Sequence, residues 1–246
     1  MSSIQQDLSV FNKFNFERPP IGVKFLFNKP EGIKRLDKNL GFCEMPKEAQ
    51  LRGTPFYADL ENQSCEPGTY VLGQDLPPVI KGGYLGAALK AFKEARANRR
   101  VYDVMPRLAP GTVNYVAFSP LDKLSFDPDL LIILTDNVSQ TEIILRALLY
   151  TTGKVLTSKT TIVLGCAWLY AYPYVIGELN YLTAGISYGM KVREAFPEGR
   201  QIISIPYDWL YTIAKNLQEM PWVPPSFTEE GEEFDKKVFD EMGISI

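Results

Sequence analysis

Hydrophobic and polar positions along this chain form blocks that predict short strands and medium-length helices. Runs rich in β-branched and aromatic residues, bounded by Pro, Gly, Asn or Asp, are typical of strands. They occupy 19–27, 54–60, 112–121, 129–136, 155–164 and 200–207. Helical periodicity or helix-ending signals mark 42–53, 84–101, 140–150 and 208–218. Strands interleaved with such helices predict an α/β fold of the mixed α+β kind, with one mixed sheet flanked by helices.

The region 84–101 has the clearest helical pattern. Leu85, Ala88, Leu89 and Phe92 are spaced at i, i+3, i+4 and i+7, so they would form one apolar face. The helix predicted over 42–53 would carry Pro46 in its first turn and close at Gly53. We expect a single domain over 1–220.

The segment 221–246 differs in composition from the rest of the chain. It is rich in proline and has two lysines against seven acids, a net charge of −5 in a chain whose total is −3. The acids are Glu229, Glu230, Glu232, Glu233, Asp235, Asp240 and Glu241. This composition predicts a linker or an arm that grips a protein partner.

A faint internal echo links two parts of the chain, 18–75 and 128–180. Each has a strand, a helix closed by glycine, an apolar stretch, a cysteine and then Tyr-Val-Leu-Gly or Tyr-Val-Ile-Gly. An ancient duplication into two similar β-α-β halves and chance explain so short a match equally well.

Composition excludes several classes of function. The chain has no histidine, which rules out Ser-His-Asp and Cys-His catalysis and histidine-bound zinc or haem. A nucleic-acid binder should have a basic surplus, whereas the basic run 90–100 is interrupted by Glu94 and reads as a solvated helix face. No export signal or membrane-length apolar run is evident, and three sparse cysteines suit a reducing compartment. We therefore expect a cytoplasmic protein without nucleic-acid or membrane partners.

The three cysteines, Cys43, Cys65 and Cys166, are the main candidates for chemistry. Their spacing contains no CxxC pair and so excludes a zinc ribbon. Cys43 opens a predicted helix, where the dipole would lower the pKa of its thiol, and Cys65 opens a glycine-rich turn. If the fold brings them together, three thiolates could hold an iron–sulfur cluster or another thiophilic metal. The alternative is that they are buried small hydrophobic residues.

Aromatic and glycine residues around the second and third cysteines suggest a ligand pocket. On a strand, the even spacing of Trp168, Tyr170, Tyr172 and Tyr174 would put four rings on one face, either stacking a flat ligand or filling the core. Glycines there would let the backbone approach a bound group closely. The predicted ligand-binding set is Gly68, Tyr70, Gly73, Tyr174 and Gly177.

Several longer motifs resemble one known family. They include "FCEMPKEAQLRG", "SCEPGTYVLG", "MPRLAPGTVNYVAFSPLD", "FDPDLLIILTDNVSQTEIILRALLYTTG" and "GCAWLYAYPYVIGELN". In this order they resemble domain-of-unknown-function family 169, found mainly in archaea and anaerobic bacteria, over about Glu17 to Leu217. The resemblance implies cysteines at the positions of Cys43, Cys65 and Cys166. Family members often carry a further cysteine in the stretch matching "LTAGISYGMKV", which has none here, so a three-thiolate site or a lost one is expected.

These observations lead to three hypotheses. The first is a protein of an anaerobe that binds an iron–sulfur cluster or other thiophilic metal through the three cysteines, in redox or cofactor handling. The second is a metal-free module for a small ligand or a subunit of a larger enzyme complex, with the arm gripping a protein partner. For the chain as a whole we expect a homo-oligomer or a complex subunit. The third is an enzyme without a cofactor that uses a low-pKa cysteine as nucleophile.

Overall fold

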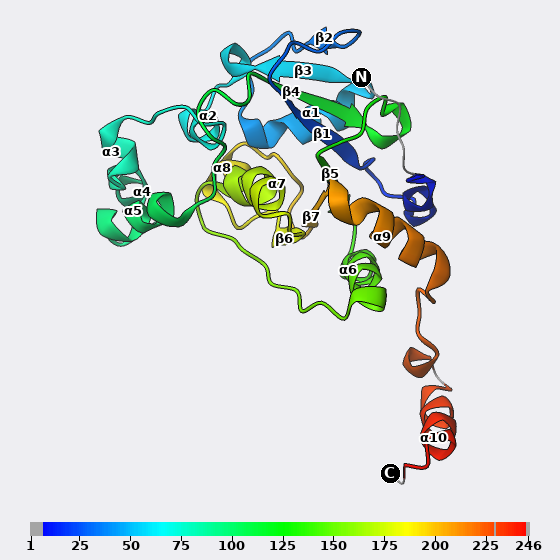
Figure 1. Ribbon diagram of the computed structural model, residues 1–246. Helices are drawn as coiled ribbons and strands as arrows, with labels where there is room; N and C mark the ends of the chain where they lie inside the picture. The colour runs from blue at the N-terminus through cyan, green and yellow to red at the C-terminus, as the bar shows by residue number, and fades with distance from the viewer. Residues whose placement is uncertain (1–6, 229, 245–246) are drawn as a thin grey trace.

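A seven-stranded sheet forms the centre of the molecule (Figure 1). The computed structural model describes residues 7–228 and 230–244. The strands are β1 (Ile21–Leu26), β2 (Lys34–Arg35), β3 (Phe56–Asp59), β4 (Tyr115–Pro120), β5 (Leu130–Thr135), β6 (Asn180–Thr183) and β7 (Gln201–Pro206), in the order β2-β3-β4-β1-β5-β7-β6. β2 and β3 run parallel and every other neighbouring pair is antiparallel. The predicted mixed α+β fold with a mixed sheet is confirmed.

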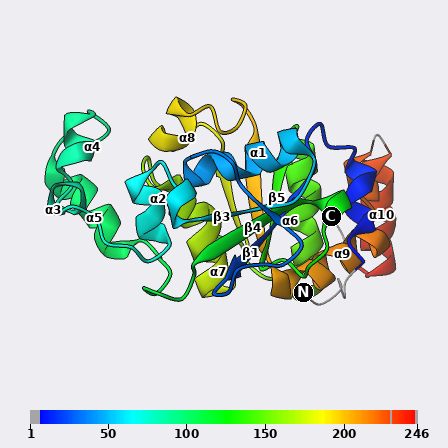
Figure 2. The ribbon, with the colours of Figure 1, turned by 90° about the horizontal axis from the view of Figure 1, so that it is seen from above.

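Helices cover both faces of the sheet (Figures 1 and 2). The α-helices are α1 (Met45–Arg52), α2 (Glu66–Val71), α3 (Pro78–Lys81), α4 (Tyr84–Ala88), α5 (Ala95–Val104), α6 (Val138–Thr152), α7 (Tyr172–Ile176), α8 (Tyr188–Val192), α9 (Tyr207–Glu219) and α10 (Gly231–Glu241). The 3₁₀ turns are η1 (Ser9–Phe14), η2 (Phe42–Glu44), η3 (Leu60–Asn62), η4 (Leu121–Lys123) and η6 (Pro225–Phe227), and η5 (Ala167–Ala171) is a π-helix.

The alternation of side chains along the strands divides the core into two layers. Phe118 and Ile132 point to the face covered by α1, α2, η5 and α8, whereas Ala117 and Leu131 point to the face covered by η1, α6 and α9. The interior strand β5, which lies between β1 and β7, is buried at all six positions. Because both faces are covered, its sequence reads as a continuous apolar run.

Local signals in the sequence explain why several helices begin and end where they do. The side chain of Asn137 caps α6 by accepting a hydrogen bond from the backbone N–H of Gln140 (3.0 Å). Gly153 follows α6 at a φ of 60°, and Gly53 follows α1 at 65°, in the left-handed region that glycine adopts without strain. The helix ends expected at these two glycines are confirmed.

The continuous helix predicted over 84–101 is wrong. The chain forms α4, reverses through residues 89–94 and continues as α5, so that α3, α4 and α5 make a helical lobe beside the sheet (Figures 1 and 2). Gly86 explains the close pairing, because a Cβ at that position would lie 2.3 Å from Nδ2 of Asn98. The same amide donates a hydrogen bond to the carbonyl of Gly83 (3.1 Å). The apolar spacing in the sequence therefore spans a turn rather than one helix face.

The strand predicted over 155–164 is also wrong, as is the strand face proposed for the four aromatic residues. Residues 155–164 form an extended connection outside the sheet, followed by η5 and α7. In these helices the rings diverge: Tyr170 is fully buried, whereas Tyr174 is 40% exposed. The strand next to β7 is instead β6, which the sequence pattern did not single out.

The echo between the two parts of the chain has a local structural counterpart. Gly73 and Gly177 each follow a short helix, α2 and α7, at positive φ. The duplication itself stays a prediction, as does the division into a domain and an arm. Within the described residues, no helix is both long and apolar enough to cross a membrane.

Asn180 ties the extended connection to the sheet, and this contact generates a prediction. Its buried amide donates to the carbonyls of Lys159 (2.9 Å) and Trp168 (2.8 Å) and accepts from the N–H of Lys159 (2.9 Å). We expect Asn180→Leu to lower the free energy of unfolding by about 2–4 kcal/mol, because these groups lose their partners inside the protein. Urea unfolding measures this. The matched change Asn114→Leu, which removes one exposed hydrogen bond to Phe27, should cost about 1 kcal/mol or less. Equal losses for the two variants would contradict the assigned role.

Candidate functional site

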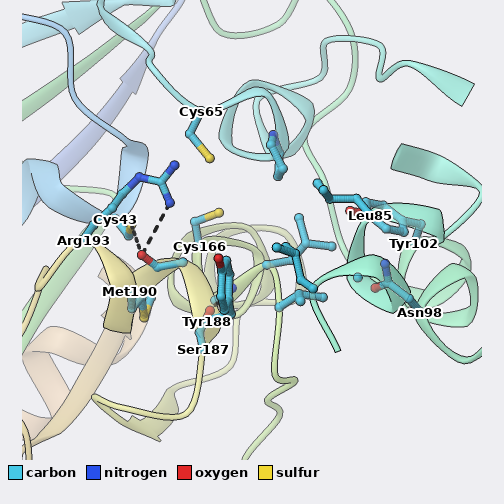
Figure 3. A pocket seen from close by; sticks show the side chains of 17 residues that line it. Cys43, Cys65, Leu85, Asn98, Tyr102, Cys166, Ser187, Tyr188, Met190 and Arg193 are labelled. Carbon is cyan, nitrogen blue, oxygen red and sulfur yellow. Dashed lines mark hydrogen bonds between the residues drawn. The ribbon is translucent and has the colours of Figure 1, made fainter. Parts of the chain in front are cut away.

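One cavity lies between the helical lobe and the part of the protein built around the sheet, which we call the sheet domain. All three cysteines line this cavity (Figure 3). Its volume is about 170 Å³. Cys43, Cys65 and Cys166 lie in η2, at the start of α2 and just before η5. The structure therefore places residues that are 22 and 101 positions apart in the sequence in the lining of one cavity.

The side of the cavity formed by the lobe is mainly apolar. Leu85 and Leu89 come from α4 and its end, and Asn98 and Tyr102 come from α5. The sheet domain contributes the cysteines together with residues of the 163–166 segment and of α8. A ligand in the cavity would contact both parts of the protein.

The wall around Cys166 has a strained and tightly packed backbone. Leu164 has a φ of 58°, which a side chain with a Cβ rarely adopts. Gly165 follows, and a Cβ there would lie 2.7 Å from Oγ of Ser187, the atom that accepts its N–H at 3.1 Å. Cys166 then leads into the π-helix η5, a kind of helix often found at functional sites.

An aromatic contact fixes Cys43 relative to Cys166. The ring of Tyr170 stacks on that of Phe42, with 4.0 Å between centroids, and its hydroxyl donates to the carbonyl of Phe42 (3.1 Å). Phe118 of the sheet packs edge-on against both rings. Because Phe42 precedes Cys43 and Tyr170 lies one turn after Cys166, this buried cluster determines where both thiols lie.

Two of the three thiols are strongly disfavoured as thiolates. Burial raises the pKa of Cys43 to about 12, although the charge of Arg193 acts in the opposite direction. Burial also raises the pKa of Cys166 far above its ordinary value, with the other two cysteines adding to the effect. The lowered pKa expected for Cys43 at a helix start is therefore wrong, because desolvation outweighs the helix dipole.

The predicted iron–sulfur or thiophilic-metal function is likewise wrong. Among residues 7–228 and 230–244, no three His, Cys, Asp or Glu side chains are placed to hold a metal ion. The sulfur of Cys43 also faces the carbonyl of Gly189, at 3.9 Å. The cysteines share a cavity without forming a coordination site.

Polar side chains interrupt the apolar lining at several points; they are Asn98, Tyr102, Ser187, Tyr188 and Arg193. Oδ1 of Asn98 is buried and has no hydrogen-bond partner within the described part of the chain. Burial raises the pKa of Tyr102 to about 12, so its phenol stays neutral. Arg193 lies at the opposite side of the cavity from Asn98 (Figure 3), 3.6 Å from a carboxylate oxygen of Glu44. Asn98 and Arg193 thus place an amide at one side of the cavity and a cation at the other.

The predicted ligand-binding residues lie outside this cavity. Gly68 packs in α2 against Phe42, and Tyr70 is buried beneath the guanidinium of Arg107, 4.4 Å from its ring centroid. Gly73 lies against the backbone of Ala109. Tyr174 and Gly177 border a separate, polar depression, together with Lys24 and Asp129. Ligand contact by these five residues stays a prediction.

Sequence reasoning missed the residues of the lobe that face the cavity. Asn98 is 1% exposed although it stands among charged residues in "EARANRR". Asn98, Val101, Tyr102 and Met105 are all buried and are spaced at i, i+3, i+4 and i+7. This spacing predicts a buried helix face and could have identified these residues from the sequence. The face begins with Asn98, an uncharged polar residue, where an apolar one would be expected.

Comparisons with known proteins identify relatives of this chain. The model of domain-of-unknown-function family 169, described as uncharacterised ArCR, matches residues 11–216. An uncharacterised protein of Methanocaldococcus jannaschii is 25% identical over 207 residues, which cover 82% of this chain and 88% of that protein. No solved structure matches the chain.

The different environments of the thiols predict different reactivities. At about pH 8, iodoacetamide should modify the partly exposed Cys65 first, because the thiolate is the reacting form and accessibility limits attack. Cys43, with its pKa of about 12, and Cys166 should react only slowly, and faster as the pH rises towards that value. Peptide mass spectrometry over time measures the order, and urea-unfolded protein, in which all three should react alike, is the control. Native Cys43 or Cys166 reacting as fast as Cys65 would show that these thiols are not buried.

Proposed function

We propose that this chain, which belongs to domain-of-unknown-function family 169, is a metal-free binding module that holds a small organic ligand between its helical lobe and its sheet domain. The observation that carries the proposal is a largely apolar cavity that Asn98 helps to line, a residue whose Oδ1 is buried and has no hydrogen-bond partner among the described residues. A metal-free module for a small ligand is the second of the three hypotheses drawn from the sequence.

The size and lining of the cavity support an apolar ligand. Leu85, Leu89, Leu164 and Met190 surround a space of about 170 Å³. Engineered apolar cavities of about 150 Å³ stay dry and bind benzene. A ligand about as large as a single six-membered ring with a small substituent therefore matches this space.

Asn98 supports a ligand with a hydrogen-bond donor. The Nδ2 atom of its amide is already bonded to Gly83, whereas Oδ1 has no partner among the residues that the structure describes. Leaving such an acceptor unpaired in the interior costs about 1–3 kcal/mol. A hydroxyl or N–H group on the ligand would satisfy it, whereas a purely apolar ligand would leave the cost in place.

Backbone strain at the cavity wall gives independent support. A leucine in the left-handed conformation, as at Leu164, costs roughly 1–2 kcal/mol. Strain of this kind persists where the surrounding structure holds it, and it gathers at binding and catalytic sites. Here it orients the segment that carries Cys166 towards the cavity.

Filling the cavity should abolish binding without unfolding the protein. Phenol serves as a probe, because it combines a six-membered ring with one hydroxyl. We expect Leu85→Trp to raise the dissociation constant for phenol at least about tenfold, equivalent to 1.4 kcal/mol, because the indole would take the ligand's space. Leu85 is 40% exposed, so the larger side chain should not disturb the core. Protein NMR titration measures the constant.

The matched control is Val79→Trp, which adds the same side chain to the lobe at an exposed position outside the cavity. It should bind phenol as the unaltered chain does. The proposal is overturned if phenol leaves the resonances of the cavity residues unchanged, or if the two variants bind alike.

Comparing phenol with toluene tests the role of Asn98. The two molecules have nearly the same shape, but only phenol can donate to Oδ1. Asn98→Leu should weaken phenol binding more than toluene binding, by about 1 kcal/mol or more, because only the first interaction includes the hydrogen bond. Equal weakening would mean that Asn98 supports the lobe without contacting the ligand.

A further inference from the structure

Helix α10 presents an apolar stripe that the described chain leaves uncovered. Phe234 and the half-buried Val238 are spaced at i and i+4 in α10, and Met242 follows at its C-cap, at i+8, so the three lie on one side of the helix. Phe234 is 41% exposed and Met242 is 66% exposed. The main packing neighbour of α10 is the short turn η6. A helix with such an exposed face is expected to bury it against another surface.

The segment that leads to α10 is fixed to the body of the protein. The ring of Trp222 stacks on Phe14, with 4.4 Å between centroids, and its N–H donates to the carbonyl of Leu217 (2.9 Å). The guanidinium of Arg146 lies 6.0 Å from the ring centroid of Phe227. From there α10 projects away from the sheet (Figure 1). Its direction is therefore set by contacts close to its base.

Charge indicates what α10 would bind. Residues 231–241 contain five acids and two lysines, a net charge of −3. Residues 78–104, which form the helical lobe, contain six basic and two acidic side chains, a net charge of +4. On and just before α5, Arg96, Arg99 and Arg100 line a shallow hollow together with Glu94 and Asp103. Arg96 lies 3.5 Å from Glu94 and Arg99 lies 4.0 Å from Asp103, so the hollow keeps a surplus of one positive charge. Exposed apolar side chains of the lobe accompany these charges: Val79, Tyr84 and Val104.

The lobe and α10 of one chain cannot meet. They lie at opposite ends of the molecule in two perpendicular views (Figures 1 and 2). The lobe that α10 could contact therefore belongs to another molecule of the same protein.

We propose that the chain self-associates, with α10 of one copy docked on the helical lobe of a second copy. The acids of α10 would face the arginines of the α5 hollow, and the Phe234 stripe would cover the apolar side chains beside it. A two-fold arrangement makes both contacts at once and closes the assembly as a dimer.

Charge reversal provides a direct test with full-length protein. One variant carries Glu232→Lys, Glu233→Lys and Asp235→Lys, and the other carries Arg96→Glu, Arg99→Glu and Arg100→Glu. In a dimer, each variant alone places like charges together at both contacts. Mixing the two restores opposite charges at both contacts. Sedimentation velocity gives the mass of each sample.

The unaltered chain should sediment as a dimer at about 0.15 M salt and dissociate further at about 1 M salt, since exposed charge pairs are screened. Each variant alone should have a dimer dissociation constant raised on the order of tenfold or more, and an equimolar mixture should recover the dimer. Lys13→Glu with Lys34→Glu, at exposed positions in η1 and β2 and so outside the lobe and α10, is the control and should leave the dimer intact.

Two outcomes overturn the proposal. The first is an unaltered chain with the mass of one copy at every concentration, which would assign α10 to a different protein. The second is a mixture that stays monomeric although both variants are folded by circular dichroism. Neither outcome bears on the cavity, because phenol binding is measured on each species separately.

Discussion

The stacking of Tyr170 on Phe42 is the interaction on which the rest of the site depends. The two rings come from segments 128 residues apart, and the hydroxyl of Tyr170 holds the carbonyl of Phe42. Both side chains are nearly fully buried on one face of the sheet, with Phe118 packed against them. Because Cys43 follows Phe42 and Cys166 precedes η5, one buried contact brings two distant thiols to the same wall. The helical lobe then closes the space that remains, and the cavity results.

Burial decides what these thiols can do. In water a cysteine at a helix start would be readily ionised, but the apolar surroundings here make the thiolate costly and raise the pKa of Cys43 to about 12. Sulfur in this state behaves as a polarizable apolar surface. That property fits a wall for an organic ligand. The buried acceptor on Asn98 and the strained backbone at Leu164 are then the features that set this cavity apart from a packing defect.

Much of the fold could be read from the sequence, because its central elements have strong local signals. The strand at 130–135 is a continuous apolar run, and α6 carries both an Asn137 cap and a Gly153 end.

The predictions that failed did so for physical reasons. The spacing of Leu85 and Leu89 looked like one long helix because the turn after α4 needs only Gly86 and a left-handed Lys90. The even spacing of the aromatic residues was taken for a strand face, but a π-helix cannot be told from a strand by so short a run. Convergence of the three cysteines required tertiary packing, which no local pattern encodes. The metal centre was wrong because proximity of sulfur atoms was equated with coordination.

The central claim is that the lobe and the sheet domain enclose an apolar space beside Cys166. Crystals of the unaltered protein pressurised with xenon would test it most directly, because xenon occupies dry apolar cavities and scatters strongly. The account predicts a xenon peak between Leu85, Leu164 and Tyr102 with the lobe in its present position. Ordered water throughout that space without xenon, or a lobe turned away from the sheet domain, would contradict it.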